Sequence, residues 1–187
     1  MDILFEKCLR DLLVKRGKTQ SELANYLSIS TQAVSKWCRG ENMPDIALLP
    51  RIASFLDVSV DELLGVGEIR KQEKIQEYRV KSYELSCKGL VVENIELWHE
   101  AYSEFPNDMA VIEGLMYALY GAGDEKYHDE ALALGERILH DSTDESQRSS
   151  AIQILCFIHD KRGNKEKAKE YAQSRATNIS LAYTFPA

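Results

Sequence analysis

A short segment of the chain carries polar and cationic side chains at helical spacing. If Val34 and Trp37 face inward on a helix, the 3.6-residue period turns a set of hydrogen-bonding side chains outward together. This set is Thr31, Gln32, Ser35, Lys36 and Arg39. Glutamine can pair with adenine through two hydrogen bonds, lysine can reach the acceptors of guanine, and short hydroxyl side chains suit base edges or phosphates. A polar helix face is more often simply solvated, so its meaning depends on the surrounding elements.

The residue types that commonly serve catalysis or metal binding are scattered along the chain. The histidines are His99, His128, His140 and His159, and the cysteines are Cys8, Cys38, Cys87 and Cys156. There is no H-E-x-x-H, G-x-S-x-G or phosphate-binding glycine motif, and no C-x-x-C pair. We therefore expect reduced thiols, and histidines at the surface or at helix ends. The sequence predicts no enzyme activity, no metal site and no cofactor.

Capping signals predict two short helices around the polar face, after a first helix over about 3–15. Thr19 and Glu22 have the spacing of a capping box, in which each side chain satisfies a backbone donor at a helix start. A second helix should therefore begin near residue 20. Ser30 is a good N-cap for a third helix over 31–38. Two short helices joined by a turn of three to four residues form a helix-turn-helix.

The small and apolar residues of this region follow the spacing that such a unit requires. Counted from Gln20, the fifth place needs a small residue, the ninth a turn residue, and the fifteenth and eighteenth apolar anchors. The chain has Ala24, Ser28, Val34 and Trp37 at these places. The sequence TQSELANYLSISTQAVSKWCRGENMP, followed by LLPRIASFLDVSVDELLG, closely resembles the Cro/phage-repressor (XRE-type) helix-turn-helix family over residues 4–65.

This resemblance implies a five-helix DNA-binding domain whose recognition helix is 31–38. It also implies that helix starts and the loop after the recognition helix hold phosphates through backbone donors and cations. The expected DNA contacts are Lys18, Gln20, Thr31, Gln32, Ser35, Lys36, Arg39 and Asn42. Trp37 is expected in the core. Ser28 departs from the glycine frequent in the family, which costs on the order of 1 kcal/mol if its backbone is left-handed. Cys38 stands where the family often has Glu.

The rest of the chain predicts three related helical hairpins over about 75–178. Gly89, Gly123 and Gly163 should each end the first helix of a hairpin, at spacings of 34 and 40 residues. The segment ENIELWHEAYSEFPND resembles the second half of a tetratricopeptide repeat, with Ala101 and Pro106 at its packing and terminating positions. Because such hairpins bury a face only by stacking, we expect a short α-solenoid whose end is covered by 176–187. The apolar residues around Trp98 are interpreted as core, with a binding groove as the alternative.

Composition and length agree with two all-α domains. The chain has 187 residues, of which 44% are hydrophobic and 28% charged, enough for one sizeable core or two small ones. The glycines at positions 65 and 67 suggest a helix end and a hinge, so the expected domains are 1–66 and 67–187, with a linker helix starting in 67–74. No apolar run approaches the roughly 20 residues needed to cross a bilayer, and the N-terminus lacks a signal-peptide pattern, so a cytoplasmic protein is expected.

The charge distribution leaves two hypotheses for function. The formal net charge of −7 counts against nucleic acid, yet the segment 15–39 holds five basic residues and one acidic residue. The leading hypothesis is a transcriptional regulator that binds palindromic double-stranded DNA as a homodimer, because one small recognition helix gives too little contact. The hairpins would then serve dimerisation or the sensing of an effector, peptide or protein ligand. The alternative is a protein-interaction adaptor with weak or no DNA binding.

Overall fold

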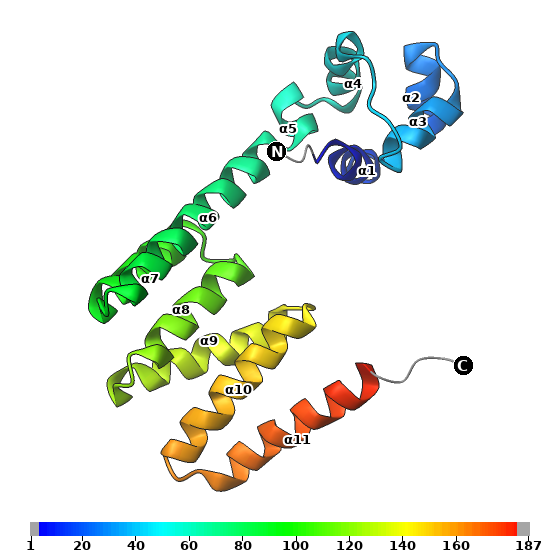
Figure 1. The fold of residues 1–187 in the computed structure, drawn as a ribbon. Helices are drawn as coiled ribbons and strands as arrows, with labels where there is room; N and C mark the ends of the chain where they lie inside the picture. The colour runs from blue at the N-terminus through cyan, green and yellow to red at the C-terminus, as the bar shows by residue number, and fades with distance from the viewer. Residues whose placement is uncertain (1–3, 183–187) are drawn as a thin grey trace. The chain divides into compact units, whose positions relative to one another are not determined.

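The chain divides into two compact units. The computed structural model describes residues 4–182, with side chains to residue 174, and this part contains helices and no strand. The N-terminal unit is Met1–Lys74 and the C-terminal unit is Ile75–Ala187, blue to cyan-green and green to red in Figure 1. Within the described residues, no helix combines the length and the apolarity needed to cross a bilayer. The domain limit expected at 66/67 stays a prediction.

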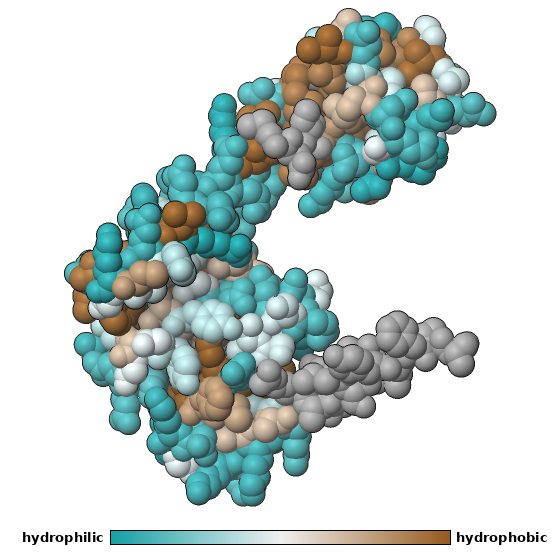
Figure 2. All heavy atoms as spheres, viewed as in Figure 1, coloured by the Kyte–Doolittle hydropathy of each residue, from teal (hydrophilic) through white to brown (hydrophobic). Residues whose placement is uncertain are grey.

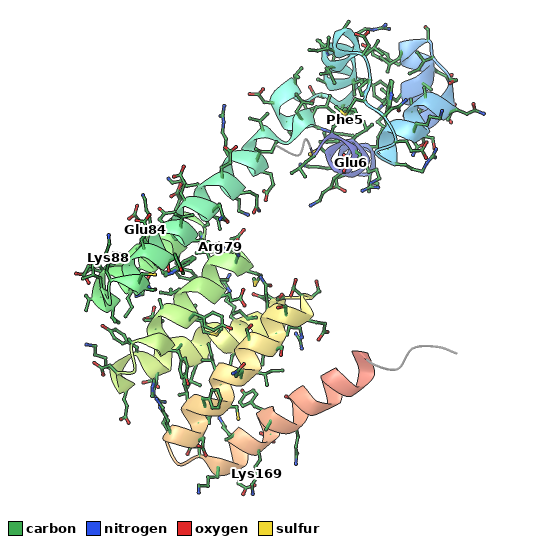
Figure 3. The ribbon with its side chains drawn as sticks, in the orientation of Figure 1. Phe5, Glu6, Arg79, Glu84, Lys88 and Lys169 are labelled. Atoms are coloured by element: carbon green, nitrogen blue, oxygen red, sulfur yellow. The ribbon has the colours of Figure 1, made fainter. Side chains whose placement is uncertain are left out.

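The described part of the N-terminal unit contains the five α-helices that the resemblance implied and the first turns of a sixth. The five helices are α1 (Phe5–Lys15), α2 (Gln20–Leu27), α3 (Thr31–Cys38), α4 (Leu49–Leu56) and α5 (Val60–Leu64), with a short 3-10 helix η1 (Ile46–Leu48) before α4. Their apolar faces meet in one core in which Phe5, Leu23 and Ile52 are fully buried. Phe5 is labelled on α1 in Figure 3. Burying each such side chain stabilises the fold by about 1.5–3 kcal/mol.

The capping signals place the helix starts of α2 and α3 as expected. The Thr19 amide donates to Glu22 Oε2 at 2.8 Å, and the Glu22 amide donates to Thr19 Oγ1 at 3.2 Å. Both halves of the capping box are thus present. Hydrogen bonds from the Thr19 hydroxyl and then from the Thr19 amide to the carboxylate lower the pKa of Glu22. Ser30 Oγ accepts from the Ala33 amide at 3.3 Å. These local bonds confirm the predicted helix-turn-helix boundaries.

Ser28 ends α2 in the left-handed conformation, with φ 60° and ψ 43°. We expect Ser28→Gly to raise the free energy of unfolding of the N-terminal unit by about 0.5 kcal/mol, because glycine adopts this backbone without a Cβ clash. Denaturant titration measures the difference. Ser28→Ala is the matched control, since alanine keeps the Cβ and should give no gain. A gain with alanine equal to that with glycine would contradict the explanation.

Three helical hairpins follow, built from six α-helices. These are α6 (Val66–Cys87), α7 (Val91–Glu104), α8 (Met109–Gly121), α9 (His128–Asp141), α10 (Glu145–Lys161) and α11 (Lys165–Ala182), with a 3-10 helix η2 (Glu125–Tyr127) before α9. Gly89, Gly123 and Gly163 lie in the three hairpin turns with φ between 70° and 75°. The predicted hairpins are therefore present. The side chains of the cap expected from 176–187 lie outside the described residues.

The hinge expected at the paired glycines is not a loop. Gly65 does end α5, with φ 69°, because its left-handed backbone closes the helix. Gly67, however, lies inside α6, which begins one residue after Gly65. The expected linker helix is the first part of α6. The helix continues well past residue 74, because Ile75 and Tyr78 are buried in the second core.

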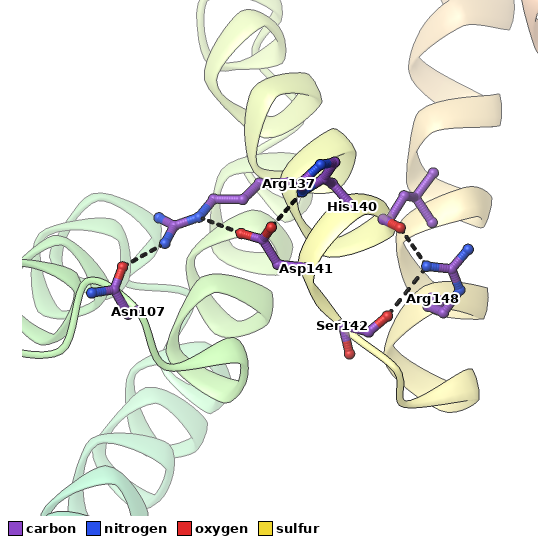
Figure 4. A network of polar contacts seen from close by, with 7 residues as sticks. Asn107, Arg137, His140, Asp141, Ser142 and Arg148 are labelled. Atoms are coloured by element: carbon purple, nitrogen blue, oxygen red, sulfur yellow. Dashed lines mark hydrogen bonds and ion pairs between the residues drawn. The ribbon is translucent and has the colours of Figure 1, made fainter.

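Polar contacts hold the connections between successive hairpins of the C-terminal unit. Arg137 on α9 donates to Asn107 Oδ1 at 2.8 Å and to the Tyr102 hydroxyl at 3.0 Å, and its Nε lies 3.3 Å from Asp141. Arg148 on α10 donates to the backbone carbonyl oxygens of Leu139 and Ser142 (Figure 4). Each guanidinium thus satisfies acceptors on a neighbouring helix or turn, which orients successive hairpins.

Two histidines lie at helix ends, His128 at the start of α9 and His159 in the last turn of α10, but they are buried and cap neither helix. His128 is 1% exposed and His159 is 5% exposed. Within the described structure, neither ring nitrogen of either side chain has a hydrogen-bond partner. The His159 ring stacks on Tyr171 of α11, with centroids 5.8 Å apart. The sequence did not reveal this because the burial depends on packing between helices rather than on local spacing.

The burial of His159 predicts a pH-dependent stability. Burial, then the positive charges of Lys167 and Arg162, lower the pKa of His159, while Glu136 acts in the opposite direction. Below the unfolded value of about 6.5, the unfolded chain takes up a proton that the native ring resists. We therefore expect stability to be full above that pH and to fall as the pH drops through the lowered native pKa. Thermal melts across this range measure the loss.

A conservative variant isolates the contribution of His159. His159→Phe keeps an aromatic ring against Tyr171 but does not titrate. Below about pH 6.5, the stability of this variant should therefore depend less on pH than the stability of the unmodified chain does. Identical pH profiles for the two proteins would show that His159 is not the responsible group.

Candidate nucleic-acid interface

Helix α3 is held by its apolar side and presents its polar side outward. Val34 is fully buried and Trp37 is 5% exposed, so both anchor the helix in the core, as the spacing predicted. Ala24 on α2 is 1% exposed at the place where a small residue lets the two helices approach. Since these three residues fix the rotation of α3, the opposite side of the helix faces solvent.

The predicted contact residues lie at the surface around α3. Six of them are exposed: Lys18, Thr31, Gln32, Lys36, Arg39 and Asn42. The other two, Gln20 and Ser35, are half-buried. Helical spacing brings Thr31, Gln32, Ser35, Lys36 and Arg39 onto one side, which we call the α3 polar face. Lys18 and Gln20 lie at the start of α2, and Asn42 lies in the loop after α3.

One acidic residue that the sequence reasoning left out lies beside the α3 polar face. Glu41 Oε1 is 2.5 Å from Arg39 Nε, and Arg39 also donates to Ser35 Oγ. The hydrogen bond between the two charged groups is the main cause that raises the pKa of Arg39 and lowers the pKa of Glu41. Arg39 is therefore oriented by two protein groups, and the net positive charge of the face is smaller than a count over 15–39 suggests.

Two cation–aromatic contacts link α4 to α2 and the residues just before it. Lys18 Nζ lies 5.5 Å from the centroid of the Phe55 ring, and the Arg51 guanidinium lies 5.8 Å from that of Tyr26. The two rings are themselves 5.1 Å apart. Arg51, which the sequence reasoning also missed, donates to the Tyr26 carbonyl at 3.0 Å. Both cations are exposed, so they can also contact an anion from solvent.

The arrangement suits hydrogen bonding to a polyanion. Amide, hydroxyl and ammonium groups on the α3 polar face can donate to base acceptors and phosphate oxygens. Among the described residues, no group of three or more metal-ligating side chains occurs. The two short helices, their turn and the outward polar face define a helix-turn-helix domain.

Comparison with known proteins supports this class for the N-terminal unit. Residues 9–63 match the helix-turn-helix family, and this part of the chain is a domain of the XRE type. The chain is similar to the HTH-type transcriptional activator BcrR of Enterococcus faecalis, with 37% identity over 65 residues. It is also similar to the cryptic phage CTXphi transcriptional repressor RstR of Vibrio cholerae, with 40% identity over 49 residues, and to the HTH-type transcriptional regulator ImmR of Bacillus subtilis, with 34% over 68 residues.

These similarities cover only part of each protein. The matched segments make up 35%, 26% and 36% of this chain, in the same order. They span 32%, 44% and 54% of the activator, the repressor and the regulator. The family match lies within the N-terminal unit, and the hairpins of the C-terminal unit are described by their own packing.

Proposed function

We propose that this chain is a sequence-specific, DNA-binding transcriptional regulator. The α3 polar face enters the major groove, with Gln32 and Lys36 on base edges and Thr31 and Ser35 on bases or phosphates. Lys18, Gln20, Arg39 and Asn42 hold the flanking phosphates. The observation that carries the proposal is the orientation of α3, whose buried Val34 and Trp37 leave its hydrogen-bonding side chains in solvent.

The proposal includes a homodimer on a palindromic site. The recognition helix has eight residues, and a contact of that size gives little specific affinity alone. Two such helices about one DNA turn apart double the contacts. The C-terminal hairpins, which resemble tetratricopeptide repeats in sequence, mediate this pairing, the sensing of an effector or peptide, or both. The relatives include both an activator and a repressor by name, so the proposal covers DNA binding and leaves the sign of regulation to experiment.

Selection from random duplexes, followed by sequencing, tests the proposal. An enriched palindrome with half-sites about 10 base pairs apart would support specific binding by a dimer. Enrichment of nothing beyond background would overturn specific binding and favour a protein-interaction adaptor. An enriched single half-site would support sequence reading and overturn the dimer.

We expect Gln32→Ala and Lys36→Ala each to weaken binding to the selected site by about 1–3 kcal/mol, because each removes a contact to a base edge. Both side chains are exposed, so the fold should be unchanged. Fluorescence titrations on the selected site and on random DNA measure the two affinities. Lys7→Ala, an exposed lysine on α1, is the matched control for lost charge. Equal losses on selected and random DNA would contradict base reading.

A further inference from the structure

The outer side of α6 carries a row of exposed side chains in the C-terminal unit. Val80 is 50% exposed, Tyr83 is 72% exposed, and Cys87 is exposed as well. Their spacing of three and four residues brings them onto one side of the helix, one turn above the other. Ile75 and Tyr78, which are buried in the second core, lie on the opposite side of α6. We call Val80, Tyr83 and Cys87 the α6 outer row.

Further exposed apolar side chains follow the α6 outer row at the turn between α6 and α7. They are Leu90, Val91 and Val92. In Figure 2, brown spheres mark apolar residues on α6 and around this turn. Glu73 and Gln76 occupy the preceding positions of the row, so its apolar part is confined to the last turns of α6. Apolar side chains gathered at a surface and bordered by polar ones favour a protein partner that removes them from water.

Two charged residues beside the α6 outer row favour a second copy of the chain as this partner. Arg79 and Glu84 are exposed, and they lie on either side of α6 in Figure 3. They are five residues apart, the spacing at which the flanks of two parallel helices meet, so Arg79 of each helix comes opposite Glu84 of the other. In an antiparallel pair, each flank would meet the same flank of the partner, and the two residues would not come together. The charges are therefore self-complementary in parallel pairing.

We propose that the intact chain dimerises through the α6 outer row, with the two α6 helices parallel and Arg79 paired with Glu84 of the second copy. The N-terminal unit precedes these residues in the chain, so parallel helices bring both reading domains to the same end of the pair, as two half-sites on one duplex require. The apolar contact covers about two helical turns. A dissociation constant on the order of 10 µM is therefore expected. The proposal rests on the proposed function and names the surface that forms its homodimer.

A charge placed in the α6 outer row tests the surface. Val80→Glu should weaken self-association of the intact chain by more than about tenfold, because a carboxylate would have to leave water when the helices pair. Val14→Glu is the matched control, since Val14 is also an exposed valine on a helix, and it should leave self-association unchanged. Analytical ultracentrifugation over a range of concentrations measures the dissociation constant, and circular dichroism checks the fold of both variants. An equal dissociation constant for Val80→Glu and the unmodified chain would overturn the proposal.

Exchange of the two charges tests the parallel alignment. Arg79→Glu and Glu84→Arg should each weaken the dimer by about tenfold, because two attractive pairs become repulsive. The double variant Arg79→Glu/Glu84→Arg restores both pairs with reversed sign, so its dissociation constant should return to that of the unmodified chain. Losses that simply add in the double variant, or no loss in either single variant, would refute the parallel alignment.

Cys87 reports the proximity of the two helices. In the parallel pair, both copies of Cys87 face each other across the twofold axis, so oxidation by copper–phenanthroline in air should link the copies by a disulfide. Cys87→Ser should remove this link. Lys81→Cys in the Cys87→Ser background places an exposed thiol on another side of α6 and should give little linked dimer. Equal linking through positions 81 and 87 would contradict the assigned surface.

DNA titrations of the same preparations separate this result from the proposed function. A chain that binds its selected DNA but whose self-association is absent, or is insensitive to Val80→Glu, overturns pairing through α6 alone. A chain that dimerises through the α6 outer row but reads no DNA sequence overturns the regulator and keeps the interface.

Discussion

Trp98→Ala is expected to lower the free energy of unfolding of the C-terminal unit by about 3–5 kcal/mol. The ring is 5% exposed and lies so close to α8 that a β-carbon at Gly114 would be 2.3 Å from Trp98 Cη2. The substitution leaves a void between α7 and α8 and removes the indole N–H that donates to Ser82 Oγ. Denaturant titration followed by circular dichroism measures the loss. Trp37 fluorescence reports the N-terminal unit in the same experiment, and its transition should stay in place.

A double-mutant cycle shows whether the close approach of Trp98 and Gly114 is the cause. Gly114→Ala alone should cost about 1–3 kcal/mol, because the packed ring has to move. In a Trp98→Leu background the same change should be neutral or favourable, since alanine has a helix propensity about 1 kcal/mol better than glycine. Gly121→Ala on the same helix is the matched control, because no neighbouring atom lies within 4 Å of the new methyl group. An equal cost of Gly114→Ala in both backgrounds would refute the coupling.

The features that could be predicted from the sequence are those fixed by bonds between near neighbours in the chain. Thr19 and Glu22 form their capping box within one helical turn, and Ser30 caps α3 in the same way. The hairpin turn at Gly89 requires a left-handed backbone, which glycine adopts at low cost. The orientation of α3 follows from the helical period once Val34 is known to be inside. Local signals therefore suffice for the helices and for the outward set of side chains.

The features that were missed depend on residues brought together by folding. Arg51 on α4 donates to the Tyr26 carbonyl oxygen on α2, a contact between residues that lie 25 positions apart in the chain. His159 is buried because α11 packs Tyr171 against it, and no local pattern marks a histidine for burial. From the sequence alone, Gly114 would be expected only to destabilise its helix, whereas the structure shows that it makes room for the Trp98 ring. Such contacts can only be read from the packed helices.

Removal of residues 75–187 is expected to weaken binding to the selected DNA site by at least tenfold, and the intact chain is expected to be a dimer. Residues 1–64 contain 8 basic and 9 acidic side chains and are therefore nearly neutral overall. The attraction of phosphates is thus confined to the neighbourhood of α3. A single domain should therefore bind weakly and with a shallow dependence on salt. Linking two domains raises the effective concentration of the second, which can increase affinity by about 10²–10⁴-fold without new contacts.

Light scattering of the intact chain and DNA titrations of both forms at several salt concentrations measure this effect. The fragment 1–74 retains the whole N-terminal unit, so its helix-turn-helix contacts are unchanged. Fusion of an unrelated dimeric coiled coil after residue 74 is the decisive control. Because α6 is already helical at that point, the fusion continues the helix, and it should restore both the affinity and the steep salt dependence if pairing is what the hairpins provide. A monomeric intact chain that binds no more tightly than the fragment would instead assign the hairpins to ligand sensing alone.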